Sequence, residues 1–180
     1  MTDPGASVCT MPVRHQARST FPAALTAVAS LAVGLVRSSG ALAADTPAYP
    51  QGAAAFQTNC ALCHGPAGAG IPSLAPPLSS YPARFAASPE GRRQLAMTVL
   101  FGMFGAITVG EAHFNSQMPD FARLDDATLA AALNFVVFDL AHAPADVKPL
   151  VPGEIAAERA HTLDGAAVRE HRKSVVPAGS

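Results

Sequence analysis

Residues 60–64 read Cys60-Ala61-Leu62-Cys63-His64, and this short stretch decides how the rest of the chain is interpreted. Two thiols with two residues between them can reach the two vinyl groups of one porphyrin, and the pattern is that of c-type haem attachment. The adjacent imidazole reaches the iron from the same side, while its second ring nitrogen donates to a protein acceptor that holds the ring. The motif therefore predicts one covalently attached haem c on Cys60, Cys63 and His64.

Three other functions of a Cys-x-x-Cys pair fit the sequence less well. A redox-active pair usually follows a strand, whereas the residues before Cys60 predict a helix. A zinc site needs a second pair of ligands at a suitable distance, and no cysteine follows Cys63. A disulfide across four residues would be strained and would add little stability.

The composition of the chain also favours a cofactor at its centre. Of the 180 residues, 6% are aromatic, none is Trp and 14% are charged, so a core made by side chains alone would be thin. Small proteins with few large apolar residues often depend on a metal, disulfides or a cofactor. The net charge of −1 argues against a nucleic acid partner, because phosphate binding needs a basic face.

The first 43 residues predict a secretory signal peptide. Arg14 and Arg18 precede an apolar run over residues 21–36, and a small-x-small sequence ends at Ala43. The run is shorter than the roughly 20 residues of a membrane-spanning helix, which favours cleavage after Ala43 over a retained anchor. The third cysteine, Cys9, would then be removed. We expect a periplasmic protein, attached to the membrane only if this segment is uncleaved.

Residues 44–143 predict one compact all-α domain of short helices. Helices are expected over 50–59, 89–101 and about 126–141, with Asp125 as the N-cap of the last. A loop rich in Gly and Pro covers 65–78, and a turn with a short hairpin is expected within 102–110. The last helix carries apolar residues at helical spacing that predict a single stripe: Leu129, Leu133, Val136 and Leu140.

Residues 144–180 form an extension whose sequence pattern differs from that of the domain. The segment 150–159 is echoed by 163–172, so that Arg159 aligns with Arg172 and Ile155 with Val168. Two short amphipathic helices packed on the domain and a mobile tail both fit this pattern. The extension is expected to be dispensable for haem binding.

The second axial ligand of the iron must come from a Met or His away from the motif. Met118 precedes Pro119 in a loop just before the last helix, and proline restricts the residue before it to extended conformations. Met97 lies on a helix face that predicts core, and Met103 lies in a glycine turn. Met118 is therefore the predicted sixth ligand, with Met103, Met97 and His113 as alternatives in that order.

Arg84 is a candidate partner of a haem propionate. It follows the Pro-rich loop, and a buried carboxylate needs a charged or hydrogen-bonding partner. A solvated surface arginine is an equally good interpretation of Arg84.

These features together resemble the class I cytochrome c family, and in particular its small bacterial monohaem members. The resemblance spans residues 47–143 and rests on CALCHGPAGAGIPSLAPPL, GMFGAITVGEAHFNSQMP and LDDATLAAALNFVVFDL. It implies the cytochrome c fold, in which short helices surround a covalently bound haem, with a C-terminal helical or flexible extension outside the shared domain. In such a fold Gly52 and Phe56 of the first helix meet Phe135 of the last.

The resemblance also implies the surroundings of the iron. Pro76 would hold His64 through its backbone carbonyl, with Pro77 and Pro72 as rivals, and Met118 would be the iron ligand. Cofactor contacts are thus expected from Cys60, Cys63, His64, Met118, Pro76 and Arg84.

Electron transfer is the function that this resemblance implies. The iron would cycle between Fe(II) and Fe(III), taking electrons from an exported dehydrogenase and passing them to an oxidase or reductase. An iron with both axial positions filled has no site for a substrate, so a carrier is expected and not an enzyme. Two alternatives stay open: a haem-bearing subunit of a membrane-bound redox complex, and a haem sensor with an open distal site. Lys148 and Lys173 are the only lysines, so docking by a strong cationic patch is not expected.

Overall fold

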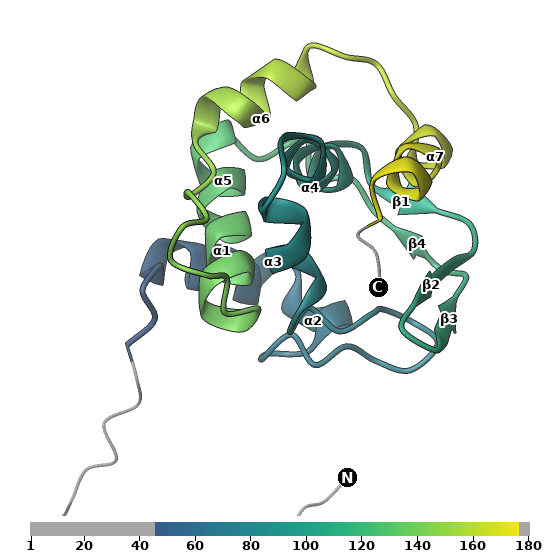
Figure 1. Ribbon diagram of the computed structural model, residues 1–180, viewed down its shortest axis with the longest axis horizontal. Coiled ribbons are helices and arrows are strands. Elements are labelled where there is room, and N and C mark those ends of the chain that lie inside the picture. The colour runs from purple at the N-terminus through teal and green to yellow at the C-terminus, as the bar shows by residue number, and fades with distance from the viewer. Residues whose placement is uncertain (1–45, 177–180) are drawn as a thin grey trace, which may run out of the picture. The chain divides into compact units, whose positions relative to one another are not determined.

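The computed structural model describes residues 46–176, and the predicted signal peptide lies outside them. The helices expected over 50–59 and 89–101 are present with these bounds, as α1 (Pro50–Asn59) and α4 (Pro89–Phe101) (Figure 1). The short helix α3 (Tyr81–Ala86) has no counterpart in the sequence analysis, because six residues are too few to show a helical period. The fold is the predicted helical one, with four short strands added. Within residues 46–176, no helix is long and apolar enough to cross a bilayer.

Helix α1 packs against α5 (Asp126–Asn134). The first helix of the domain thus meets the last, as the resemblance implied. Gly52 allows the two backbones to approach closely, since a Cβ at this position would lie 2.0 Å from the backbone oxygen of Ala131. One turn later Phe56 is fully buried, and its ring centroid lies 5.4 Å from that of Phe135. The contacts predicted for Gly52 and Phe56 are therefore confirmed.

The last helix of the domain changes type part-way along. Asp125 caps α5 as predicted, and its carboxylate accepts from the backbone N–H of Thr128 at 2.7 Å. From Phe135 to Leu140 the chain is π-helical, with wider turns that rotate the following side chains. Leu129 and Leu133 therefore share the main core with Val137, whereas Val136 packs beside Phe56 in a second cluster. The predicted single stripe through Val136 and Leu140 is wrong for this reason.

Four short strands form two antiparallel pairs. Strand β2 (Ile107–Val109) pairs with β3 (Ala112–Phe114) through a turn at Gly110, so the expected hairpin is present but extends beyond residue 110. Strand β1 (Met103–Phe104) pairs with β4 (Gln117–Met118) and places Met103 directly opposite Met118. This second pair joins segments that the sequence analysis did not connect.

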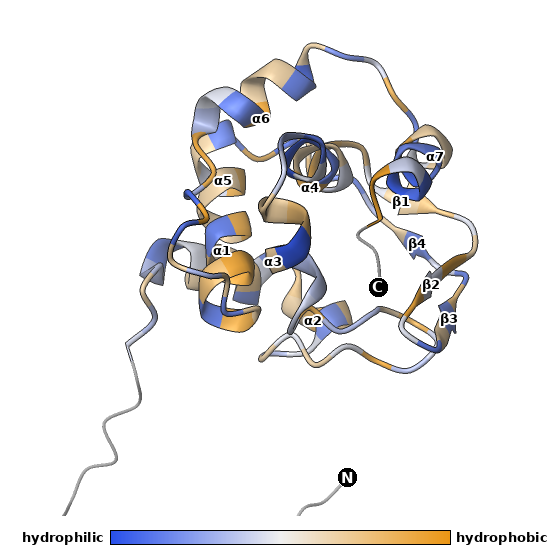
Figure 2. Cartoon of the chain, viewed as in Figure 1, coloured by the Kyte–Doolittle hydropathy of each residue, from blue (hydrophilic) through white to orange (hydrophobic). Residues whose placement is uncertain are grey.

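The C-terminal extension is helical and packs on the domain. Helix α6 (Pro152–Arg159) lies against α4 and α5, and α7 (Gly165–Val175) lies against α4 and β1 (Figure 1). Figure 2 shows hydrophilic residues along much of α7, but Val168 on its inner side is fully buried, as is Ile155 of α6. Of the two arrangements that the repeated pattern allowed, packed helices are the one observed.

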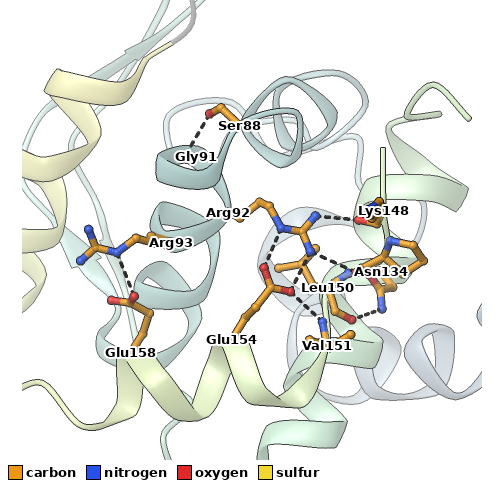
Figure 3. Close-up of polar contacts among 11 residues, drawn as sticks. Ser88, Gly91, Arg92, Arg93, Asn134, Lys148, Leu150, Val151, Glu154 and Glu158 are labelled. Atoms are coloured by element: carbon orange, nitrogen blue, oxygen red, sulfur yellow. Dashed lines mark hydrogen bonds and ion pairs between the residues drawn. The ribbon is translucent and has the colours of Figure 1, made fainter. Parts of the chain in front are cut away.

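A buried amide holds the chain that leads into α6. The side chain of Asn134, at the end of α5, donates to the carbonyl oxygen of Leu150 at 2.9 Å and accepts from its N–H at 2.7 Å (Figure 3). Leu150 itself is 2% exposed and belongs to the main core. The extension is thus continuous with the core of the domain.

Two ion pairs connect α4 to α6 (Figure 3). Arg92 forms two hydrogen bonds with the carboxylate of Glu154, at 2.6 and 2.7 Å, and Arg93 donates to buried Glu158 at 2.9 Å. Glu154 also accepts from the N–H of Val151 at 2.9 Å. Glu154 thus satisfies the backbone N–H of the N-cap residue, although the valine side chain itself accepts no hydrogen bond from the helix.

The close crossing of α1 and α5 makes Gly52 intolerant of a side chain. We expect Gly52→Ala to lower the free energy of unfolding by about 1–3 kcal/mol or more, the usual cost of overpacking. Gly153→Ala is the matched control, because a Cβ there meets nothing within 4 Å; alanine is favoured over glycine in a helix by up to about 1 kcal/mol. Denaturant unfolding of the two holoproteins measures the difference, and equal midpoints would contradict the close crossing.

Candidate haem site

A large cavity with mostly apolar walls lies between the two core clusters and opens to solvent. The space between its walls is about 1400 Å³ when the region open to solvent is included. Phe121 and Leu133 of the main core line it from one side, and Phe56 and Val136 of the second cluster line it from another. The polypeptide thus leaves room at its centre for a large, flat and mainly apolar group.

The Cys-x-x-Cys-His motif forms one tight turn in the wall of this cavity. Helix α1 ends at Asn59, and α2 (Ala61–His64) starts after Cys60, whose carbonyl accepts from the N–H groups of Cys63 and His64 at 3.2 and 3.0 Å. Cys60, Cys63 and His64 all line the cavity, and both thiols are free. The turn therefore presents two thiols and one imidazole to the same space.

The environment of the thiols argues against the other functions of such a pair. Burial, with a smaller effect from Cys63, raises the pKa of Cys60 to about 11. A redox-active cysteine needs a lowered pKa, because the thiolate is the reactive form. Among residues 46–176, no group of three or more His, Cys, Asp or Glu side chains could complete a zinc site.

His64 is held in the form that a metal ligand requires. The side chain is 9% exposed, and its Nδ1 lies 2.9 Å from the carbonyl oxygen of Pro76. A carbonyl can only accept, so Nδ1 carries the proton and Nε2 keeps its lone pair. Burial lowers the pKa of His64 more than the bond to Pro76 raises it, which favours the neutral ring. Of the three candidate prolines, Pro76 makes this bond.

Gly70 shapes the loop that carries Pro76, and the sequence analysis did not single it out. Its φ is +77°, and a Cβ there would lie 2.7 Å from the carbonyl oxygen of Ala75. The N–H of Gly70 donates to the carbonyl of His64 at 2.8 Å. The sequence shows several glycines in this loop, but it does not indicate which of them reverses the chain direction.

Two of the four candidate sixth ligands line the cavity. Met118 does so from β4, and Met103 does so from the opposite position on β1. Gly102 lets these segments meet, because its φ is +69° and a Cβ there would lie 2.4 Å from the carbonyl oxygen of Met118. Met97 is 2% exposed in the helical core, and His113 is exposed on β3; neither lines this cavity.

Comparison with known proteins shows the family of this chain. Residues 47–136 match the family model described as cytochrome C oxidase, cbb3-type, subunit III. Two relatives named cytochrome c-552, both from Thermus thermophilus, are each 34% identical to this chain over 124 residues. The match covers 68% of this chain, and 95% and 84% of the two relatives. The chain belongs to the class I cytochrome c family.

Membership of the cytochrome c family makes this chain a c-type cytochrome, an electron carrier with covalently attached haem c. The residues in the cavity fit that cofactor. Cys60 and Cys63 would supply the two thiols, His64 would supply a nitrogen ligand from the same turn, and Met118 and Met103 offer thioethers from the strands. The apolar walls suit a porphyrin, which would replace the side chains that the thin core lacks.

Arg84 and Arg172 differ in their position relative to the cavity. Arg84 is exposed, its guanidinium lies 5.7 Å from the ring centroid of Tyr81, and it does not line the cavity. Its contact with a propionate stays a prediction. Arg172 of α7 does line the cavity and is 8% exposed. The sequence analysis aligned Arg172 with Arg159 but gave it no role, because nothing local connects the extension with the haem motif.

Loss of both thiols should separate haem from the chain. We expect Cys60→Ser/Cys63→Ser to carry no covalent haem and to be largely unfolded, because the cavity is then left unfilled. Leu62→Ser is the matched control: it places the same serine between the cysteines at a side chain that is 88% exposed. Haem staining after denaturing electrophoresis and a pyridine haemochrome spectrum provide the measurements. A double variant that accumulated folded and free of haem would contradict this account of the site.

Proposed function

We propose that this cytochrome c is an exported monohaem carrier that takes electrons from a periplasmic dehydrogenase and passes them to an oxidase or reductase. The observation that carries the proposal is the cavity itself, which His64 lines from the haem-attachment turn and two methionines line from the strands. Residues 60–64 are the only Cys-x-x-Cys-His motif in the sequence, which supports one haem. When bound, haem c supplies an iron that alternates between Fe(II) and Fe(III).

Met118 is the sixth ligand in this proposal. Pro119 keeps the residue before it extended, and Gly102 allows the backbone of β1 to approach Met118 closely. With His64 and Met118 both binding the iron, no coordination site would be left for a substrate, so a carrier and not an enzyme is proposed. A thioether ligand also raises the reduction potential and thereby favours the reduced form.

Electrons are proposed to leave through an apolar rim beside the attachment site. We call Leu62, Ile71 and Leu74 the apolar rim; they are 88%, 38% and 44% exposed, and Leu74 also lines the cavity. Weak electron-transfer encounters use small interfaces, which suit a partner that must leave again. Since the chain has only two lysines, apolar contact is proposed to contribute more to docking than a cationic patch does.

A second function is favoured by the family model that the chain matches. Its description names a subunit of a cbb3-type oxidase, so a haem-bearing subunit of a membrane-bound redox complex is the alternative. The two functions differ in whether the N-terminal segment stays attached. Amino-terminal sequencing of the exported protein decides between them: a mature start near Ala44 supports the diffusible carrier, and an intact N-terminus supports the anchored subunit.

Removal of the proposed sixth ligand should leave one coordination site of the iron free for water or an added ligand. We expect Met118→Ala to keep its covalent haem, to give a high-spin or water-ligated ferric spectrum, to bind carbon monoxide or cyanide, and to have a lower potential. Met103→Ala is the matched control, because it removes the same group from the opposite strand position. Visible spectra with and without ligand provide the measurement. If Met103→Ala opened the iron instead, the ligand assignment would be wrong; if the parent already bound these ligands readily, the haem-sensor alternative would hold.

Charge placed on the apolar rim should slow electron transfer without changing the haem. We expect Leu62→Asp to reduce the rate of electron self-exchange between oxidised and reduced copies by about tenfold, since like charges then face each other during encounter. Val151→Asp is the control, because Val151 is 53% exposed just before α6 and does not line the cavity. Nuclear magnetic resonance line broadening in mixed redox states measures the rate. Equal rates in both variants would exclude the apolar rim as the docking surface.

A further inference from the structure

Helix α7 places one buried arginine in the wall of the haem cavity. Arg172 is the only Asp, Glu, Lys or Arg among the described residues that line the cavity. Its Nη2 donates to the carbonyl oxygen of Thr108 at 3.2 Å, and its guanidinium carbon lies 6.0 Å from the ring centroid of Phe85. Within the part of the chain that the structure describes, no carboxylate forms an ion pair with it. Arg172 is thus a buried cation without a countercharge from residues 46–176.

The repeat within the extension shows what is unusual about Arg172. Arg159 occupies the aligned position of the first repeat and has a complete set of acceptors. Its guanidinium pairs with Asp126 at 2.8 Å and also donates to the carbonyl oxygens of Ala122 and Leu124, at 2.6 and 2.8 Å. Arg172 has a single carbonyl acceptor, although it is the more buried of the two side chains. Its other donors are therefore free to bind a group within the cavity.

The position of Arg172 is set by packing and not by the cavity. Val168, one turn earlier, is fully buried, and Gly165 at the start of α7 brings the helix close to β1, since a Cβ there would lie 3.0 Å from the Cα of Met103. Gln94 Oε1 lies 2.7 Å from Nδ1 of His171, which ties the same turn to α4. The guanidinium is therefore preorganised at the cavity wall.

We propose that Arg172 binds a propionate of the haem, so that the C-terminal extension forms part of the haem site. Haem carries two propionate carboxylates, and burying a carboxylate is costly unless it is paired. A planar guanidinium can bind a carboxylate with two parallel hydrogen bonds. Burying either the guanidinium or the propionate alone in this cavity would be costly, whereas the two together form an ion pair. The inference rests on the covalent haem and is independent of the redox partners in the proposed function. The extension then contributes a contact to the haem, and the expectation that it is dispensable for haem binding stays a prediction.

The reduction potential, measured against pH, tests the proposal on the holoprotein. In Arg172→Gln the propionate would lose its cation. Its negative charge would then stabilise the ferric iron and lower the potential, and its pKa would rise. We therefore expect the variant's potential to fall with pH between about pH 5 and 8, whereas the parent stays flat above the usual carboxyl range near pH 4. Lys173→Gln is the matched control, since it removes one positive charge from an exposed position on the same helix.

Other titratable or charged groups lie near α7 and are unchanged in both variants. They come from α3, α4, β3 and α7 itself, and are Tyr81, Glu90, Arg93, His113, Arg169, Glu170 and His171. A pH dependence that appears in Arg172→Gln and not in Lys173→Gln therefore belongs to the propionate. Equal profiles in the two variants would overturn the proposal. A new pH dependence in Arg84→Gln instead would assign the propionate to Arg84 and would equally overturn it.

A measurement on the parent covers the case in which Arg172→Gln does not fold. In the reduced, diamagnetic protein, nuclear Overhauser effects are expected between the guanidinium protons of Arg172 and the propionate methylene protons of the haem. Their absence, with guanidinium protons exchanging as fast as those of a solvated arginine, would overturn the proposal. A parent without the visible spectrum of covalent haem would instead contradict the haem assignment, so the two failures are distinguishable.

Discussion

The structure depends on an apolar cavity that the polypeptide does not fill. The large side chains form two clusters, one around Leu100, Leu133 and Ile155 and one around Phe56 and Phe135, and the cavity lies between them. In most small domains such a void would be destabilising, because its lining loses packing contacts. A porphyrin bound here would supply those contacts and act as the largest apolar group of the core. This explains how a chain with no Trp and few aromatic residues can form a stable domain.

The iron site is built from backbone geometry on both sides of this cavity. On the attachment side, the carbonyl of Pro76 sets the tautomer of His64, and Gly70 bends the loop so that this carbonyl can reach the ring. On the other side, Gly102 lets β1 and β4 meet and brings Met103 and Met118 to the wall. In both places a glycine with positive φ does what no other residue could do without strain. The donors are thereby positioned by the chain before any metal–ligand bond is considered.

The extension is joined to the domain by polar contacts that are mostly buried or half-buried. Asn134 bonds twice to the backbone of Leu150, and Arg92 and Arg93 pair with Glu154 and Glu158. Breaking a buried pair leaves a charge without a partner, which costs far more than the pair contributes as a whole. The main effect of these contacts is therefore to specify a single position for α6. Their net contribution to stability is smaller. Helix α7 comes after α6 in the chain and packs against α4 and β1, where its residue Arg172 lines the cavity.

The sequence by itself determined the features that neighbouring residues specify. The haem-attachment motif, the helices over 50–59 and 89–101, the Asp125 cap and the Gly52–Phe56 face all follow from spacings of a few residues, because helical periods and caps are local. Tertiary structure decided the rest. The π-helical turn after Asn134 redirected Val136, and β-pairing placed Met103 opposite Met118. Packing of α7 brought Arg172 to the cavity that the haem-attachment motif also lines, more than a hundred residues earlier in the chain. Such contacts join segments far apart in sequence, and no local pattern specifies them, because they depend on how all the buried surfaces fit together at once.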